Sequence, residues 1–277
     1  MWGFTKIFLI LVLMKSCYAA PAASSERVET DPMLIAGYTE GDMILSKDRN
    51  GLISETYRWP NGTVYYYFNS DIDQEQRNLI QQAFRTIESV SCVVFKEATR
   101  DQPGYLNITS DKVGCFAEVG YLGRPQELNL MKNDCFSLGI IVHEVLHSLG
   151  FHHQQCTWNR DEYVRIHLEN VKKGLEYNFH KYNKDTVDNF GEEYDYGSIM
   201  HYKSNAFSKN DKPTIVPLIK GYEKCTSRRA GFVCDKRLAS VLATARALAS
   251  SSSGGGSNQS TRKRGHVRLT AFMLRLF

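Results

Sequence analysis

The sequence predicts an α+β fold, in which a mixed β-sheet is backed by helices and followed by a loop-rich half. Short aromatic and β-branched segments bounded by turn residues indicate strands, and two longer segments carry apolar residues at helical spacing. Their order along the chain, strand–helix–strand–strand–helix, is typical of a mixed sheet with helices packed against it. The periodicity is lost beyond about residue 152, which predicts an irregular second half.

The first twenty residues are typical of an export signal. Lys6 precedes an apolar run at 7–14 that is too short to span a bilayer, and small residues follow it. We predict a signal peptide at 1–19, removed after Ala19; the alternative is a buried N-terminal segment. Six cysteines remain after this cleavage, and an even number in an exported chain favours disulfides over thiolate ligands. We therefore expect a secreted, extracellular protein.

Other features of the composition agree with export. The sequons Asn61-Gly62-Thr63 and Asn107-Ile108-Thr109 predict a glycoprotein, although such tripeptides are common by chance. No second apolar stretch approaches the length of a membrane span. The net charge of +4 is concentrated at the C-terminus, where residues 221–277 carry 11 Lys and Arg against 2 Asp and Glu. We expect neither a nucleic acid nor a membrane as a partner.

The elements are expected in the following order. Residues 20–49 are polar, lack periodicity and end in Lys47-Asp48-Arg49, which predicts a pro-segment with a basic cleavage point. The first strand is expected at 63–69, and a helix at about 74–90 because its apolar residues share one helical face. Further strands are expected at 92–95, 105–109 and 128–131.

Two more helices are expected in the remaining chain. Segment 136–152 is apolar at helical spacing until Gly150 stops it, and a third helix is expected near 166–180. Residues 249–260 are Ser, Gly, Asn and Gln of low complexity, which indicates a flexible linker. No core is expected from the residues that follow this linker.

Residues 143–153, H-E-V-L-H-S-L-G-F-H-H, carry the chemistry. His143 and His147 are four residues apart, so a helix projects both imidazoles from one face. Gly150 permits the positive φ that ends the helix sharply, and the chain then returns His153 to the same ion. Three neutral imidazoles suit one Zn²⁺ and leave a position open for water. Glu144 can reach that water as a general base without being a ligand.

The short motif alone has an alternative, because H-E-x-x-H occurs by accident in helices with two solvent-facing histidines. The added Gly150 and His153 at their required spacing argue against that alternative. His152 is one residue out of register, and we expect it to face solvent or to lie behind the ligands. Downstream, Y-G-S-I-M-H-Y at 196–202 matches the Met-turn of metzincin proteases.

Together these motifs resemble the astacin metalloproteases over about residues 50–218. R-W-P-N-G at 58–62, G-C-F at 114–116 and L-N-L at 128–130 also match. The resemblance implies a metzincin-like catalytic domain of two subdomains, a twisted mixed sheet with helices above a cleft and an irregular lower subdomain. It implies a zinc metalloendopeptidase with one Zn²⁺ per chain, made as a zymogen and acting on protein or peptide substrates. We expect a monomer that a separate protease activates.

The resemblance also implies roles for single residues. Tyr202 matches a tyrosine that can ligate zinc at rest and swing out to support the oxyanion, and Met200 would pack under the metal. Thr39-Glu40-Gly41-Asp42 resembles the pro-segment switch, which normally begins with Phe. Asp42 would then cap the zinc and keep the enzyme latent; the alternative is a solvated turn aspartate.

The resemblance further implies a Cys115–Cys135 disulfide, and an edge strand at 116–120 that pairs with extended substrate. The domain organisation that we predict is a signal peptide at 1–19, a pro-segment at 20–49, an astacin-like domain at 50–220 and a basic, disordered tail at 221–277.

The sequence departs from the family at two places. Gln154 stands where the family has Glu directly after the third histidine, which predicts a weaker link between maturation and the site. The resemblance stops after Pro217, so the end of the domain is predicted to be incomplete. The partner of Cys92 stays open, the candidates being Cys156, Cys225 and Cys234. The alternative function is therefore a secreted zinc-binding module, poorly active or a decoy.

Overall fold

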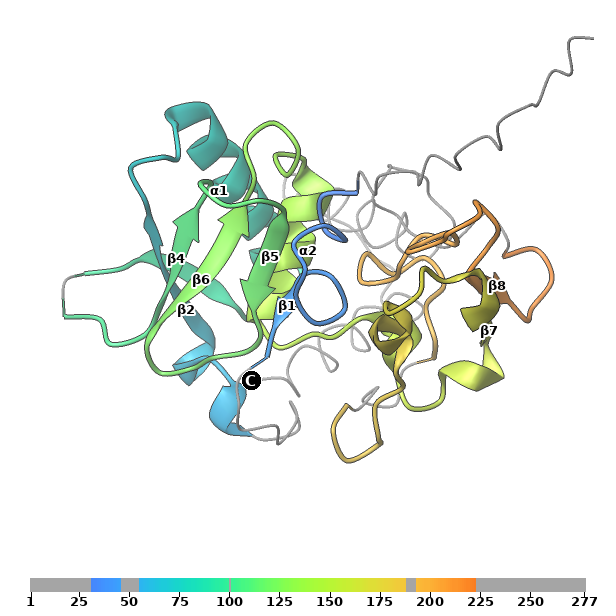
Figure 1. Ribbon diagram of the computed structural model, residues 1–277. Coiled ribbons are helices and arrows are strands. Elements are labelled where there is room, and N and C mark those ends of the chain that lie inside the picture. The colour runs from blue at the N-terminus through green and yellow to red at the C-terminus, as the bar shows by residue number, and fades with distance from the viewer. Residues whose placement is uncertain (1–30, 46–54, 100, 188–192, 223–277) are drawn as a thin grey trace, which may run out of the picture.

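Six strands form one mixed sheet in the described part of the chain. The structure is a computed structural model that describes residues 31–45, 55–99, 101–187 and 193–222 (Figure 1). The strand order is β1-β5-β6-β4-β2-β3, in which β5 and β6 pair antiparallel and all other neighbours pair parallel. The strands are β1 Met43–Ile44, β2 Thr63–Phe68, β3 Val94–Glu97, β4 Tyr105–Thr109, β5 Cys115–Glu118 and β6 Pro125–Leu130.

The prediction of an α+β fold with a mixed sheet is confirmed. The strands expected at 63–69 and 105–109 are β2 and β4. The strand expected at 92–95 is displaced to Val94–Glu97, and the one expected at 128–131 already begins at Pro125. The predicted signal peptide, the cleavage point at Arg49 and almost all of the predicted tail lie outside the described residues.

Helix α1, Gln74–Glu88, has a complete capping box at its start. The Asp73 carboxylate accepts from the backbone N–H of Gln76 at 2.9 Å, and the Gln76 side chain accepts from the N–H of Asp73 at 2.9 Å. One face of the helix is buried in the core under the sheet, as the apolar spacing predicts. The buried apolar residues of this face are Ile80, Ala83, Phe84 and Ile87.

Helix α2, Leu138–Ser148, begins at the Ser137 cap and ends in a Schellman motif. The N–H of Gly150 donates to the carbonyl of His147 at 2.8 Å, and the N–H of Phe151 to that of Leu146 at 2.9 Å. Gly150 has a φ of 104°, which a residue with a side chain rarely adopts. The glycine therefore reverses the chain immediately after the helix, as predicted.

The prediction of a helix near 166–180 is wrong. The segment begins with β7, Val164–Ile166, which pairs antiparallel with β8, Ile215–Pro217, and continues in short 3₁₀ turns. Two of its backbone amides bond to a distant segment: the N–H of His167 donates to the carbonyl of Thr214 at 2.8 Å, and that of Lys172 to the carbonyl of Phe207 at 2.9 Å. Tertiary pairing thus supplies the partners that a helix would have provided locally.

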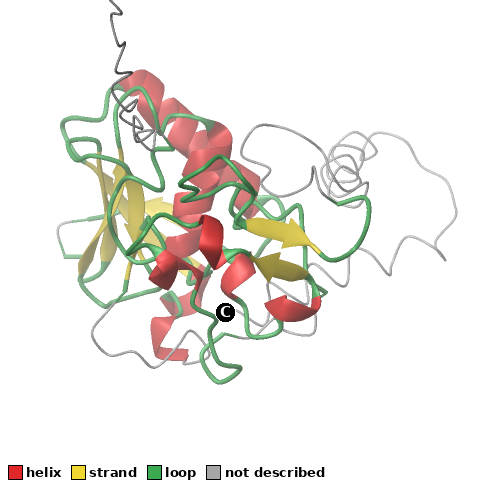
Figure 2. Cartoon of the chain, turned by 45° about the vertical axis from the view of Figure 1, so that its right-hand side comes forward, coloured by secondary structure: helices red, strands yellow, loops and turns green. Residues whose placement is uncertain are grey.

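Two hydrophobic cores lie in the two halves of the chain, one under the six-stranded sheet and one around β7 and β8. In Figure 2 the small β7–β8 sheet stands apart from the large sheet, with helices between them. Residues 31–45, called the N-terminal arm below, contribute Met33 to the first core and Leu34 to the second. In Figure 1 the arm (blue) accordingly lies between the two halves.

The Cys115–Cys135 disulfide implied by the resemblance is present. Cys92 is exposed and Cys156 is buried, and both are free thiols within the described residues, so they are not bonded to each other. The other two candidate partners of Cys92 lie outside the described residues. Among the described residues, none of the helices is both long and apolar enough to cross a membrane.

Candidate metal centre

Four side chains that could bind a metal converge between the two halves of the chain. His143 and His147 project from one face of α2, His153 follows the turn at Gly150, and Asp42 comes from the arm. Their ligand atoms all lie within 4.8 Å of one another, and all four side chains are buried. The structure thus brings the three predicted zinc ligands together with the predicted latency residue.

The spacing of these atoms fits a tetrahedral zinc site. Ligand atoms at about 2.0–2.1 Å from zinc in a tetrahedron lie about 3.3–3.4 Å apart. The Nε2 atom of His143 is 3.0 Å from that of His147 and 3.3 Å from that of His153. The Asp42 carboxylate oxygens lie 3.3 Å from Nε2 of His143, 3.5 Å from Nε2 of His147 and 3.3 Å from Nε2 of His153.

The other nitrogen of each imidazole is held by an acceptor. Nδ1–H of His143 donates to the carbonyl of Ile199 at 2.7 Å, and that of His147 to the carbonyl of Phe151 at 2.7 Å. Nδ1–H of His153 donates to the Glu40 carboxylate at 2.8 Å. A proton on Nδ1 leaves the Nε2 lone pair free, which is the form that binds metals.

A cation is therefore required at the centre. Three Nε2 lone pairs and a carboxylate that face one another repel, unless a positive charge lies between them. Burial lowers the pKa of His153, but Asp42 and Glu40 outweigh it and raise the pKa to about 9. Burial likewise raises the pKa of Asp42, but the charge of His153 and the neighbouring imidazoles hold it well below its usual range.

The turn that carries Asp42 has an unusual backbone. Tyr38 and Gly41 exchange two backbone hydrogen bonds, and between them Glu40 has a φ of 51°. This left-handed conformation costs about 1–2 kcal/mol for a residue with a side chain, so other contacts must hold Glu40 in place. Gly41 has a φ of 91°, and a Cβ atom there would lie 2.7 Å from the carbonyl oxygen of Met33. Only glycine fits this position.

The arm also covers the edge of the sheet. Met43 and Ile44 form β1, which pairs parallel with β5. The expectation that 116–120 is an edge strand is therefore wrong while the N-terminal arm is in place, because β1 occupies the position beside β5. Without the arm, β5 would be the edge strand that the resemblance implies.

Tyr202 is fully buried and lies against the arm. Its hydroxyl donates to the backbone carbonyl of Glu40, and its ring centroid is 4.6 Å from that of His153. Its backbone N–H donates to the Gln155 side chain at 3.0 Å. While the arm is in place, the Tyr202 hydroxyl is thus hydrogen-bonded to the arm.

The remaining predicted residues lie around this group. Glu144 is fully buried on α2, next to the first ligand. Met200 is buried in the Met-turn, and its carbonyl accepts from the N–H of Gln154 at 2.9 Å. His152 is not one of the four converging residues, and its ring packs edge-on against Tyr182 at 4.6 Å.

Sequence reasoning missed three groups that position residues of the site. Glu40 lies inside the motif that suggested Asp42, but the motif gave it no role. Gln155 follows the departure at Gln154 and holds the backbone of Tyr202. The carbonyl of Ile199 fixes the ring of His143, and a backbone atom leaves no signal in the residue types.

Comparison with known proteins gives a family match and several relatives. The family model described as Astacin, a peptidase family, matches residues 51–236. The chain is 42% identical over 209 residues to Seminal metalloprotease 1 of Drosophila melanogaster, covering 72% of this chain and 83% of that protein. It is 38% identical over 189 residues to Zinc metalloproteinase nas-13 of Caenorhabditis elegans, covering 68% of this chain but only 41% of that protein.

A solved structure is also similar. High choriolytic enzyme 1, a hatching enzyme zinc-protease from the medaka fish Oryzias latipes, superposes with a TM-score of 0.57 at 32% sequence identity. The similarity covers 68% of this chain and 92% of that one.

Proposed function

The chain belongs to the astacin family and is a zinc metalloendopeptidase, and from this premise we propose that it is a secreted enzyme made as a zymogen, which its own N-terminal arm keeps latent. The observation that carries the proposal is the position of Asp42. Its carboxylate lies within 3.5 Å of all three imidazoles, at the corner of the site that a catalytic water needs.

We assign roles to the residues as follows. His143, His147 and His153 hold the zinc through Nε2. When bound, zinc polarises the scissile carbonyl and lowers the pKa of a coordinated water. Glu144 accepts the proton of the attacking water and delivers it to the leaving amine. The Tyr202 hydroxyl donates to the developing oxyanion once the arm no longer engages it.

Latency is supported by three contacts of the arm. Asp42 occupies the open corner of the site, β1 covers the edge of β5 where an extended substrate would pair, and Glu40 engages both His153 and Tyr202. Burial of Met33 and Leu34 in the two cores holds the arm down. Removal of the arm would uncover the ligand corner and the substrate edge together.

Export is supported by the predicted signal peptide and by the disulfide, since disulfides persist in oxidising compartments. Substrates are proteins or peptides, as the peptidase family implies. A separate activating protease, N-glycosylation and a monomeric state belong to this proposal as well.

The alternative of a decoy module has no support in the described residues. The three histidines, Glu144 and Tyr202 are all present and buried, which is the arrangement of a complete site. The family match continues past residue 220, the predicted end of the domain, to residue 236. The domain boundaries themselves remain predictions.

The test is activation of the full-length chain with trypsin, followed by hydrolysis of casein with and without a zinc chelator. We expect little hydrolysis before trypsin, a rise after cleavage near Arg49, and loss of the rise with chelator. A Glu144→Ala chain treated identically controls for trypsin carried over. If the intact chain hydrolyses casein as fast as the cleaved chain, the proposal of latency fails. If neither chain shows chelator-sensitive hydrolysis, the active-protease proposal fails in favour of the decoy.

A further inference from the structure

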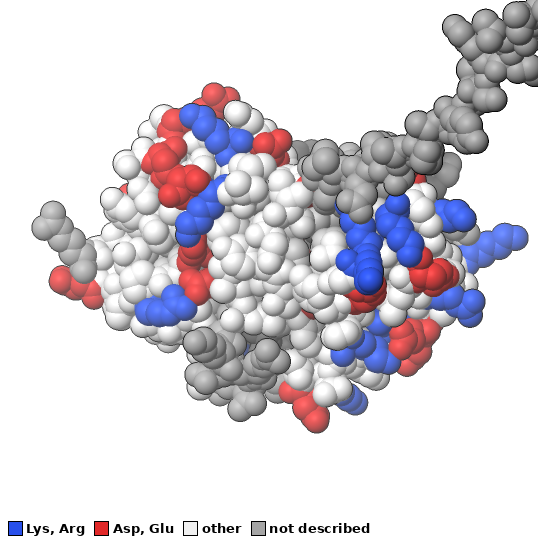
Figure 3. All heavy atoms as spheres, viewed as in Figure 1, with Lys and Arg blue, Asp and Glu red and all other residues white. Residues whose placement is uncertain are grey.

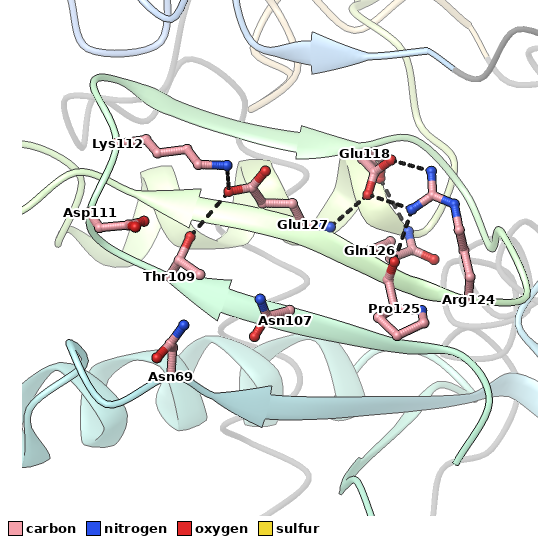
Figure 4. A pocket seen from close by; sticks show the side chains of 10 residues that line it. All are labelled: Asn69, Asn107, Thr109, Asp111, Lys112, Glu118, Arg124, Pro125, Gln126 and Glu127. Carbon is pink, nitrogen blue, oxygen red and sulfur yellow. Dashed lines mark hydrogen bonds and ion pairs between the residues drawn. The ribbon is translucent and has the colours of Figure 1, made fainter. Parts of the chain in front are cut away.

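The outward face of β4 presents a sequon between two tyrosines. Leu106 and Ile108 point into the core and are fully buried, so the alternate residues of the strand point away from it. In Figure 4 Asn107 and Thr109 lie on this outward face, with the helices behind the sheet. Asn107 itself thus lies on the outward side of the sheet, whereas Thr109 is buried and its hydroxyl donates to the Asn129 side chain at 3.0 Å.

Two aromatic rings flank Asn107. Tyr105 precedes it by two residues on the same face of the strand, and Tyr67, which is 50% exposed, is its register partner on β2. The two rings are 6.4 Å apart and meet edge-on at 69°. The Asn107 side chain accordingly starts in the corner between two tyrosine rings, one of them half exposed.

Asn107 also lines a polar cavity of about 380 Å³ (Figure 4). Its walls carry two ion pairs, Lys112 with Glu127 and Arg124 with Glu118, the latter at 2.6 Å. The front of the molecule over these strands accordingly shows interspersed basic and acidic side chains (Figure 3). The side-chain amide of Asn107 forms no hydrogen bond within the described residues, so it is available for modification.

We propose that Asn107 carries an N-linked glycan whose first sugar packs against Tyr105 and Tyr67. The amide nitrogen displaces the diphosphate from the anomeric carbon of a lipid-diphosphate-linked oligosaccharide. An N–C bond forms, the C–O bond to the diphosphate breaks with its electron pair, and the amide loses one proton. The C–H face of the sugar then covers the tyrosine rings, while its hydroxyl and N-acetyl groups reach the polar cavity. The inference rests on the proposed export, because this transfer occurs in the secretory pathway.

The structure distinguishes this sequon from the other one. Asn61 also follows an aromatic residue by two positions, namely Trp59. Trp59, however, is 2% exposed and its indole N–H donates to the carbonyl of Ser148 at 2.8 Å, so no sugar can reach its ring. Asn61 itself lies on an exposed turn. A glycan at Asn61 would project into solvent without stabilising the fold, whereas one at Asn107 stabilises it.

The test expresses the full chain in a eukaryotic secretory host and maps glycopeptides by mass spectrometry. The expected result is a modified Asn107. The melting temperature should fall by about 2–4 °C in Asn107→Gln and should not change in the matched control Asn61→Gln. Trimming the glycan with an endoglycosidase that leaves one sugar should preserve the melting temperature of the glycosylated chain. In a Tyr105→Leu background the Asn107→Gln substitution should no longer lower the melting temperature.

A second version of the chain, with residues 1–19 replaced by a proven signal peptide, separates the two proposals. If only this version is exported, the prediction of a signal peptide at 1–19 is wrong, and the glycan at Asn107 is then tested in this version. An exported chain with unmodified Asn107 overturns the inference. A modified Asn107 whose loss lowers the melting temperature equally with and without Tyr105 overturns the packing of the sugar.

Discussion

The Glu40 carboxylate lies 2.8 Å from Nδ1 of His153, so a residue of the N-terminal arm orients one of the three proposed zinc ligands. Asp42 faces the same ring from its Nε2 side at 3.3 Å. One imidazole is thus held between two carboxylates of the same turn. The arm both covers the site and takes part in its geometry.

Glu40→Ala should loosen the proposed zymogen. The substitution removes the acceptor of His153 Nδ1–H, and hydrogen bonds to charged groups contribute about 1.5–3 kcal/mol. We expect the intact chain to release zinc to a colorimetric chelator roughly tenfold faster or more. Glu40→Gln retains an acceptor oxygen and is the matched control, expected to lie close to wild type. Equal release rates for Glu40→Ala and wild type would show that the contact has no positioning role.

Asp42→Asn should give the uncleaved chain activity. The neutral amide is a weaker metal ligand, so the fourth corner opens to water more often. We expect hydrolysis of a fluorogenic peptide by the intact chain to rise by roughly tenfold or more, which corresponds to about 1.4 kcal/mol. Asp31→Asn is the control, because this arm carboxylate pairs with the half-exposed Lys203 and is not one of the four converging residues. Equal activity of the two variants would contradict the capping role.

Gly41→Ala should disrupt the turn that carries Asp42. A Cβ atom there would meet the carbonyl oxygen of Met33 at 2.7 Å, at a φ of 91°. Gly37→Ala is a matched control with a similar φ of 80° but nothing within 4 Å of the added atom. Peptide hydrolysis by the uncleaved chain should therefore rise more in Gly41→Ala than in Gly37→Ala. The same small rise in both would mean that backbone conformation matters and the close contact does not.

Glu144→Ala should separate zinc binding from catalysis. The three imidazoles remain, so the purified protein should contain one zinc per chain by elemental analysis. Loss of the general base should lower kcat by about 10²–10⁴-fold after activation. His143→Ala is the contrasting variant, expected to lose both zinc and activity. Wild-type rates in Glu144→Ala would exclude the proposed mechanism.

Much of the fold was predictable because its signals are local. The buried face of α1 follows from the spacing of its apolar residues. The alternation of buried and outward side chains at the start of β4 follows from the residue types of that one short segment. The helix expected near 166–180 failed because amides such as that of Lys172 pair with residues more than thirty positions away. Single-segment periodicity cannot register such pairing.

The sequence by itself determined the proposed ligand set. His143 and His147 share a face because they are four residues apart on a helix, and Gly150 returns the chain to His153 within one turn; both relationships are short-range. Only the tertiary structure decided what holds those ligands. Glu40 meets His153 across 113 residues, and the Ile199 carbonyl meets His143 across 56. These contacts exist because the arm packs between two cores, and the relative position of distant segments depends on the whole packed chain.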